Sequence, residues 1–277
     1  MKNLFLIILF FNYFFLEAQN KKNIDLLIQT NRFSLSEVHG LKPKEYVFLG
    51  KYYLDRYNKQ DFDFEQLREG LSKLVPNKQD SVFLNIDIEN QVYKDLRSDN
   101  QKTRKNAVEK FIKVVDFVKR ERPSVKVGFY GIPFTFNFPF QKRYNYYDDL
   151  KPLLEKVDYI SPNLYFSYSH HQKSDLWYVN KIQENLDLFL EYSYKIRKPL
   201  YIYVWYLVHP YNKQYGMQLI SENRMNLLLK TIQETSYKGQ KAKGIIWWQP
   251  ANTDYNTMGQ RKMDINELLI RYTKGLK

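Results

Sequence analysis

The sequence alternates short apolar runs with segments whose apolar residues recur at helical spacing. The apolar runs are typical of β-strands buried on both faces, and they cover residues 47–49, 82–89, 125–133, 159–166, 200–207 and 244–248. Helical spacing is found at 62–74, 108–118, 150–157, 182–190, 225–232 and 265–272. This alternation predicts an α/β fold in which helices cover a parallel sheet.

A doubly wound open sheet and a closed barrel both fit this alternation. The glycine-rich loop that marks dinucleotide-binding sheets does not follow the first run, which favours the barrel. The chain has 277 residues without a linker or repeat, so we expect a single domain over 19–277. We predict a distorted TIM-like (β/α) barrel of about 7–8 strands, in which a degenerate strand near 33–35 could supplement the clear runs.

The first 18 residues are similar to a secretory signal peptide. Lys2 precedes an apolar run from Leu4 to Leu16, and the small residue Ala18 follows. The run is too short to span a bilayer comfortably, although an uncleaved anchor or a buried N-terminal helix would have a similar composition. We expect a secreted or periplasmic protein without stable membrane insertion after cleavage.

Composition excludes several functional classes. The absence of cysteine rules out disulfide scaffolds, Cys-ligated zinc, iron–sulfur clusters and thiol nucleophiles. The formal net charge of +13 suggests an acidic partner. Because Lys and Tyr are spread through the whole chain, we expect no nucleic-acid-binding module. His170 and His171 are adjacent and lack the spacing of metal ligands, and we expect neither a metal nor a cofactor.

Polar and aromatic residues stand at the C-terminal ends of the predicted strands, where barrel enzymes carry their chemistry. Such residues suit a sugar, because its apolar faces stack on rings and its hydroxyls bond to amides. The candidate substrate-binding residues are Tyr130, Asn163, Tyr165, Tyr206, Trp247 and Gln249. Trp247 and Trp248 alternate in direction, so only one can line the barrel mouth, and Trp247 could instead be plain core.

Asp87 and Glu89 form the candidate catalytic pair. Side chains two residues apart on a strand point to the same side, and two close carboxylates among apolar neighbours raise the pKa of one of them. Such a group can protonate a glycosidic oxygen. The close spacing suits substrate-assisted hydrolysis, in which Asp87 orients an N-acetyl group and Glu89 protonates the leaving group. The pair could otherwise be solvated charge or a cap for a helix after Asn90, with a base elsewhere, such as Asp55 or Asp254.

The order of these motifs resembles glycoside hydrolase family 56, the hyaluronidases. The resemblance spans roughly 45–250, and the matching segments are 84–89 with its D-x-E pair, 128–133 (GFYGIP), 161–165 (SPNLY) and 244–247 (GIIW). It implies a distorted barrel with Glu89 as general acid/base and Asp87 positioning the N-acetyl group. It also implies that Tyr165 bonds near the reacting sugar and that Trp247 forms part of its floor.

The sequence also departs from the family. Residues 90–94 replace a stretch rich in Trp and Arg, Phe136 replaces a site tyrosine, and the family's disulfides are absent. We expect a secreted glycosidase that cleaves a hyaluronan-like polysaccharide containing N-acetylhexosamine, with anionic glycosaminoglycans among the possible substrates. The alternative is a non-catalytic carbohydrate-binding protein on the same barrel.

Overall fold

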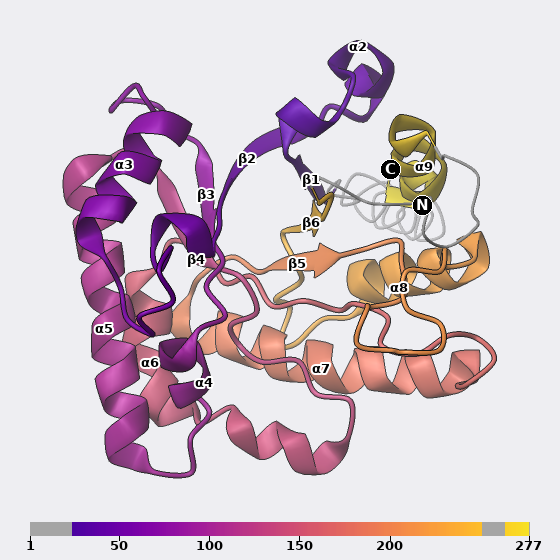
Figure 1. Ribbon diagram of the computed structural model, residues 1–277. Helices are drawn as coiled ribbons and strands as arrows, with labels where there is room; N and C mark the ends of the chain where they lie inside the picture. Colours follow the sequence, from indigo (N-terminus) through magenta and orange to yellow (C-terminus); the bar gives the residue numbers. More distant parts are fainter. Residues whose placement is uncertain (1–23, 251–263, 277) are drawn as a thin grey trace, which may run out of the picture.

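The computed structural model describes residues 24–250 and 264–276 (Figure 1). The expected leader and Asp254 lie outside the described residues. Within them, six parallel strands form one sheet in the order β4-β3-β2-β1-β6-β5. The strands are β1 (Asp25–Ile28), β2 (Lys44–Leu49), β3 (Phe83–Ile86), β4 (Lys126–Phe129), β5 (Tyr201–Val204) and β6 (Gly244–Trp247).

The helices lie on the outside of the curled sheet (Figure 1). They are α2 (Leu35–Val38), α3 (Phe64–Leu74), α4 (Gln91–Asp95), α5 (Gln101–Glu121), α6 (Tyr147–Lys156), α7 (Asp175–Ile196), α8 (Glu222–Glu234) and α9 (Ile265–Thr273). Short 3-10 helices are η1 (Thr30–Arg32), η2 (His39–Leu41), η3 (Lys51–Tyr53), η4 (Pro139–Tyr144) and η6 (Lys274–Leu276). The α/β class and the TIM-like architecture are therefore confirmed. Within the described residues, no helix combines the length and apolarity needed to cross a membrane.

The long helices begin at side chains that cap their free backbone N–H groups. Asp63 accepts from Glu65 N at the start of α3, and Asn100 accepts from Thr103 N at the start of α5. Such caps typically stabilise a helix by about 1 kcal/mol. Helix α5 ends at Glu121, shortly before a proline, as the sequence predicts.

Residues 158–164 join the two end strands of the sheet, β4 and β5. The backbone N–H of Gly131, beyond β4, donates to Ser161 O at 2.9 Å, and Tyr203 N in β5 donates to Pro162 O at 2.8 Å. Pro162 has no N–H, so this segment makes isolated bridges instead of a regular ladder. The barrel thus closes through six regular strands and one irregular segment, which accounts for its distortion.

The strand expected near 33–35 is wrong, because Phe33 and Ser34 connect η1 to α2 and Leu35 is the first residue of α2. The additional strand is β1, which lies between β2 and β6. Its four residues, DLLI, are too few for periodicity to separate a strand from a buried helix fragment.

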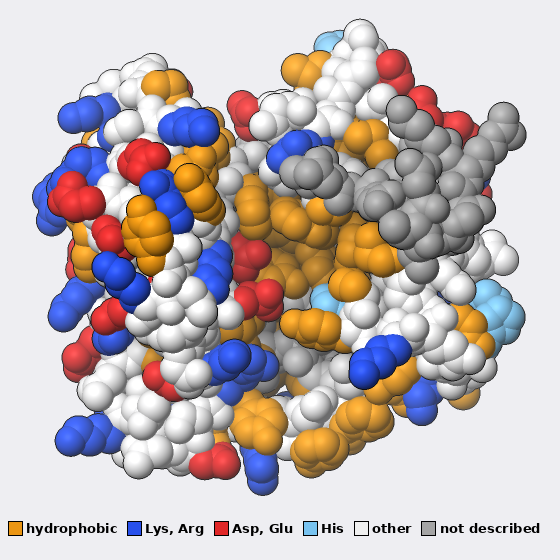
Figure 2. All heavy atoms as spheres, viewed as in Figure 1, with side chains coloured by type: hydrophobic (Ala, Val, Ile, Leu, Met, Phe, Trp, Pro, Cys, Tyr) orange, Lys and Arg blue, Asp and Glu red, His pale blue; other side chains and the backbone are white. Residues whose placement is uncertain are grey.

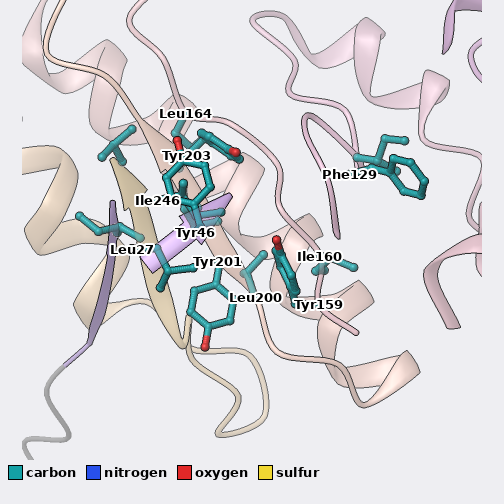
Figure 3. Close-up of a cluster of buried hydrophobic side chains, with 14 of the residues drawn as sticks. Leu27, Tyr46, Phe129, Tyr159, Ile160, Leu164, Leu200, Tyr201, Tyr203 and Ile246 are labelled. Atoms are coloured by element: carbon teal, nitrogen blue, oxygen red, sulfur yellow. The ribbon is translucent and has the colours of Figure 1, made fainter. Parts of the chain in front are cut away.

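Buried tyrosines fill the barrel interior (Figure 3). The rings of Tyr46 and Tyr203 meet edge to face at 6.0 Å, and those of Tyr159 and Tyr201 do so at 5.5 Å. Gly128 in β4 makes room for Tyr159, since a Cβ atom at this position would lie 2.5 Å from its ring. The packed rings form a rigid floor beneath the C-terminal ends of the strands.

Candidate active site

An open pocket of about 470 Å³ lies at the C-terminal ends of the strands. Figure 2 shows a hollow on this face, in which hydrophobic side chains gather and acidic side chains stand at the edge. Four of the predicted site residues line the pocket: Glu89, Tyr130, Asn163 and Tyr165. They come from the segments after β3 and β4 and from the closing segment of the barrel, so the structure brings them together from distant parts of the chain.

The two candidate carboxyls differ in their surroundings. Asp87 extends the ladder of β3 by donating its backbone N–H to Leu49 O at 2.9 Å, and its side chain is partly buried. Its Oδ1 atom is buried and has no hydrogen-bond partner among the described residues. Burial, and secondly the charge of Glu89, raise the pKa of Asp87 to about 7. The pair therefore keeps a proton close to neutral pH.

Glu89 is exposed in the pocket. Desolvation by the surrounding protein raises the pKa of Glu89, and the charge of Arg97 opposes that rise. The next residue, Asn90, caps α4 by accepting a hydrogen bond from Tyr93 N at 3.3 Å. Asn90 thus supplies the helix cap that was the alternative role of the carboxylates, and Glu89 remains available to a ligand.

Aromatic rings form one wall of the site. The rings of Tyr130 and Tyr165 lie 6.0 Å apart, and Trp205 lies 5.7 Å from Tyr165. Burial raises the pKa values of both tyrosines well above the usual value. Their hydroxyls therefore stay protonated and can donate hydrogen bonds to a sugar.

The structure does not bring Tyr206, Trp247 and Gln249 to the described part of the pocket. Trp247 is fully buried and stacks on Tyr206 at 5.7 Å, while the Tyr206 hydroxyl donates to Gln249 Oε1 at 2.9 Å. None of the three is among the described residues that line the pocket, and their part in substrate binding stays a prediction. The physical reason for the placement of Trp247 is strand alternation, because Trp247 points toward Tyr272 of α9, at 6.2 Å, and away from the barrel interior.

The sequence left open which of the two tryptophans at the end of the last strand faces the barrel interior. Trp248, the neighbour of Trp247, faces inward and packs on Phe48 at 4.7 Å and near Tyr203 at 6.5 Å. In the structure, Gly244, four residues earlier, lies on the same inward face, and a Cβ there would lie 2.7 Å from the ring of Tyr201. Side chains that are an even number of positions apart share a face.

Comparison with known proteins supports the fold. No protein-family model matches the sequence, and a search of curated proteins gives no match. Bee venom hyaluronidase is similar in structure, with a TM-score of 0.63 and 16% identity, over 91% of this chain and 97% of that chain. Bee venom hyaluronidase in complex with a hyaluronic acid tetramer gives a TM-score of 0.61 and 15% identity, over 91% and 96%. The chain thus shares the fold of bee venom hyaluronidase, and at the level of the fold this confirms the resemblance seen in the motifs.

Proposed function

We propose that this protein is a secreted glycoside hydrolase that cleaves a polysaccharide containing N-acetylhexosamine by a substrate-assisted, retaining mechanism. The observation that carries the proposal is the carboxyl pair, with Asp87 partly buried and Glu89 exposed in a pocket walled by aromatic rings. The usual retaining mechanism needs a second carboxylate about 5 Å away, across the scissile bond. Glu89 is the only Asp or Glu among the described residues that line the pocket, so the nucleophile is better supplied by the substrate.

Each step of this mechanism has a group in the site. Glu89 donates its proton to the glycosidic oxygen as the bond to the anomeric carbon breaks. The carbonyl oxygen of the N-acetyl group attacks that carbon and forms a cyclic, positively charged intermediate. With the proton of the pair on Glu89, Asp87 is ionised, and its partly buried carboxylate accepts the amide N–H of this group and stabilises the charge. Water then attacks the same anomeric carbon, which opens the cyclic intermediate and restores the N-acetyl group. The water gives up one proton to Glu89.

The aromatic wall supports a sugar in this position. Tyr130 and Tyr165 line the same pocket as Glu89, and their hydroxyls stay protonated. Trp248, which faces the barrel interior beside Tyr203, takes the role of floor that the motif resemblance implies for Trp247. Apolar sugar faces pack well on such rings.

The test is to incubate the purified protein with hyaluronan, chondroitin, chitin oligosaccharides and peptidoglycan and to measure new reducing ends. We expect release from at least one polymer, and Glu89→Gln should lower kcat by about 10²–10⁴-fold while leaving binding largely intact. Glu37→Gln, a change at an exposed residue of α2, is the matched control and should retain full activity. Binding without any release by the wild-type protein would instead support the non-catalytic carbohydrate-binding alternative.

A further inference from the structure

Two exposed phenylalanines stand beside the rim of the pocket, in the segment between β4 and α6. Phe138 is 37% exposed and Phe140 is 64% exposed. Their rings are nearly parallel, with centres 6.0 Å apart and planes at 7° to each other. Asn137, the residue before them, lines the pocket. The pair therefore presents an apolar surface to solvent next to the pocket.

A short turn, η4, holds this pair in place. The turn begins with a proline, whose ring fixes the backbone. The Gln141 side chain accepts the backbone N–H groups of Asn137 at 2.8 Å and Phe138 at 3.1 Å. After the turn, Asn145 accepts from Phe134 N at 2.7 Å and donates to Phe134 O at 2.8 Å. The rings are thus displayed on an ordered loop, which loses little conformational freedom when it binds a partner.

Cations flank the apolar pair. Lys142 and Arg143 follow Phe140 and are exposed, and neither forms an ion pair with any part of the chain that the structure describes. The segment 137–145 contains no Asp or Glu. Figure 2 shows hydrophobic and Lys or Arg side chains beside one another along the lower edge of the molecule, where Figure 1 places this turn. We call this group the docking tip, and its members are Phe138, Phe140, Lys142 and Arg143.

Exposed rings next to unpaired cations suit the surface of an anionic bilayer. Such rings enter the boundary between headgroups and acyl chains, and the cations are attracted to the lipid phosphates. A sugar-binding platform would instead combine its rings with polar groups that bind hydroxyls. In the docking tip the rings carry no polar atom, and the nearby Gln141 carbonyl is engaged by the backbone.

We propose that the docking tip binds the surface of a bilayer that contains anionic phospholipids. Binding is reversible, because two rings and two cations are a small contact. A docked molecule holds its pocket beside the bilayer, since the tip directly follows the pocket residue Asn137. This inference does not rest on the proposed hydrolysis.

The test places an environment-sensitive dye at the tip itself. The chain has no cysteine, so Phe140→Cys in the full chain provides a single thiol, and the attached dye NBD restores an apolar ring. We expect a blue shift on vesicles of phosphatidylcholine and phosphatidylglycerol in equal amounts, and quenching by lipids brominated in their acyl chains. Vesicles of phosphatidylcholine alone should give a much weaker signal. Because the dye reports its own surroundings, binding through the apolar N-terminal run would not produce this signal.

Further changes in this labelled chain separate the two kinds of contact. Lys142→Gln together with Arg143→Gln should weaken the apparent affinity for the mixed vesicles about 10- to 30-fold, since each cation near an anionic surface contributes a factor of about five. Phe138→Ser should weaken the affinity about tenfold, because less apolar surface leaves water. Added salt should lower the affinity of the unchanged tip and have less effect once both cations are removed.

Two controls match the tip in chemistry but not in position. Arg120→Gln removes an exposed cation that also lies on a ring, 4.9 Å from the centre of Phe117, and should leave the affinity unchanged. Leu35→Cys places the dye at a 52% exposed residue of α2, at the opposite edge of the molecule (Figure 1), where we expect no blue shift.

The proposal fails if the dye at position 140 shows no blue shift on the mixed vesicles. It also fails if the signal is as strong on neutral vesicles or survives the loss of both cations. A dye response to hyaluronan or chitin oligosaccharides without a response to vesicles would overturn it as well, because the rings would then be a sugar platform. None of these outcomes alters the test of hydrolysis by Glu89→Gln.

Discussion

The side-chain amide of Asn90, the residue directly after Glu89, donates a hydrogen bond to the Asp55 carboxylate at 3.2 Å. Asp55 also accepts the backbone N–H groups of Lys59 at 2.6 Å and Gln60 at 3.1 Å, and only 3% of its surface is exposed. Its oxygens are thus engaged by the loop before α3 and by the cap of α4. This arrangement gives Asp55 a structural role instead of the role of an alternative catalytic base.

Asp55→Asn should therefore destabilise the protein without changing which group titrates in catalysis. The new amide NH₂ group cannot accept the backbone N–H groups, and one unsatisfied buried donor costs about 1–3 kcal/mol. Urea denaturation should show this loss in the free energy of unfolding. Asp61→Asn, a change at an exposed residue that pairs with Lys110 at 2.9 Å, should cost less than about 1 kcal/mol. Unchanged stability together with a shifted pH–rate profile would restore Asp55 as a base.

The pH dependence of hydrolysis should follow the Asp87–Glu89 pair, which must carry one proton to act. The pKa of Asp87 is raised to about 7, and the pKa of Glu89 is also raised, so the last proton leaves the pair close to neutral pH. We expect kcat/KM to fall above about pH 7, up to about tenfold per pH unit. Asp87→Asn removes a like charge and should move the alkaline limb of the residual activity to lower pH. If the alkaline limb stays at the same pH in Asp87→Asn, the limb reports the titration of another group.

The stability of the protein should also depend on Asp87 and pH. Its pKa is raised from 3.8 to about 7, so the folded state binds this proton more tightly than the unfolded state does. Ionised Asp87 therefore destabilises the fold increasingly between these two pH values. Asp87→Asn should change stability little near pH 4 and raise it by roughly 2–4 kcal/mol near pH 8.

Urea denaturation at both pH values checks this expectation. Asp116→Asn is a suitable control, because Asp116 pairs with Lys156 at 2.6 Å on the surface and should show no such trend. An equal gain from Asp87→Asn at the two pH values would contradict the assignment of the raised pKa.

Alanine substitutions at Trp247 and Trp248 should affect different properties: the first mainly the stability of the fold, the second mainly ligand binding. Trp247 is fully buried, so Trp247→Ala should lower the free energy of unfolding by about 3–5 kcal/mol. Trp248 is only partly buried, and Trp248→Ala should cost about 1–2 kcal/mol but weaken the binding of hyaluronan oligosaccharides. Urea denaturation and calorimetry measure the two effects. Intact binding in Trp248→Ala would show that another ring forms the floor.

Much of the fold could be predicted because buried parallel strands and amphipathic helices leave a clear apolar pattern. Five of the six clear runs overlap strands β2 to β6, and the sixth overlaps the closing segment. The carboxyl pair could be located because it ends such a run. The direction of Trp247 could not be settled from the last run alone, because both tryptophans are apolar and a shift of one residue reverses the faces. Arg97 lies in a turn after a five-residue helix, and no periodic pattern predicts where a turn places its side chain.

The closure of the barrel by residues 158–164 has a consequence for behaviour in concentrated solution. An open six-stranded sheet would leave β4 and β5 with rows of unpaired backbone groups, and such edges recruit strands from other chains. The bridges that Ser161 and Asn163 make with Tyr130 and Tyr203 cover both edges. The segment that places Asn163 in the pocket therefore also protects the protein against edge-to-edge aggregation, in a chain that has no cysteine and so no disulfide to restrain partial opening.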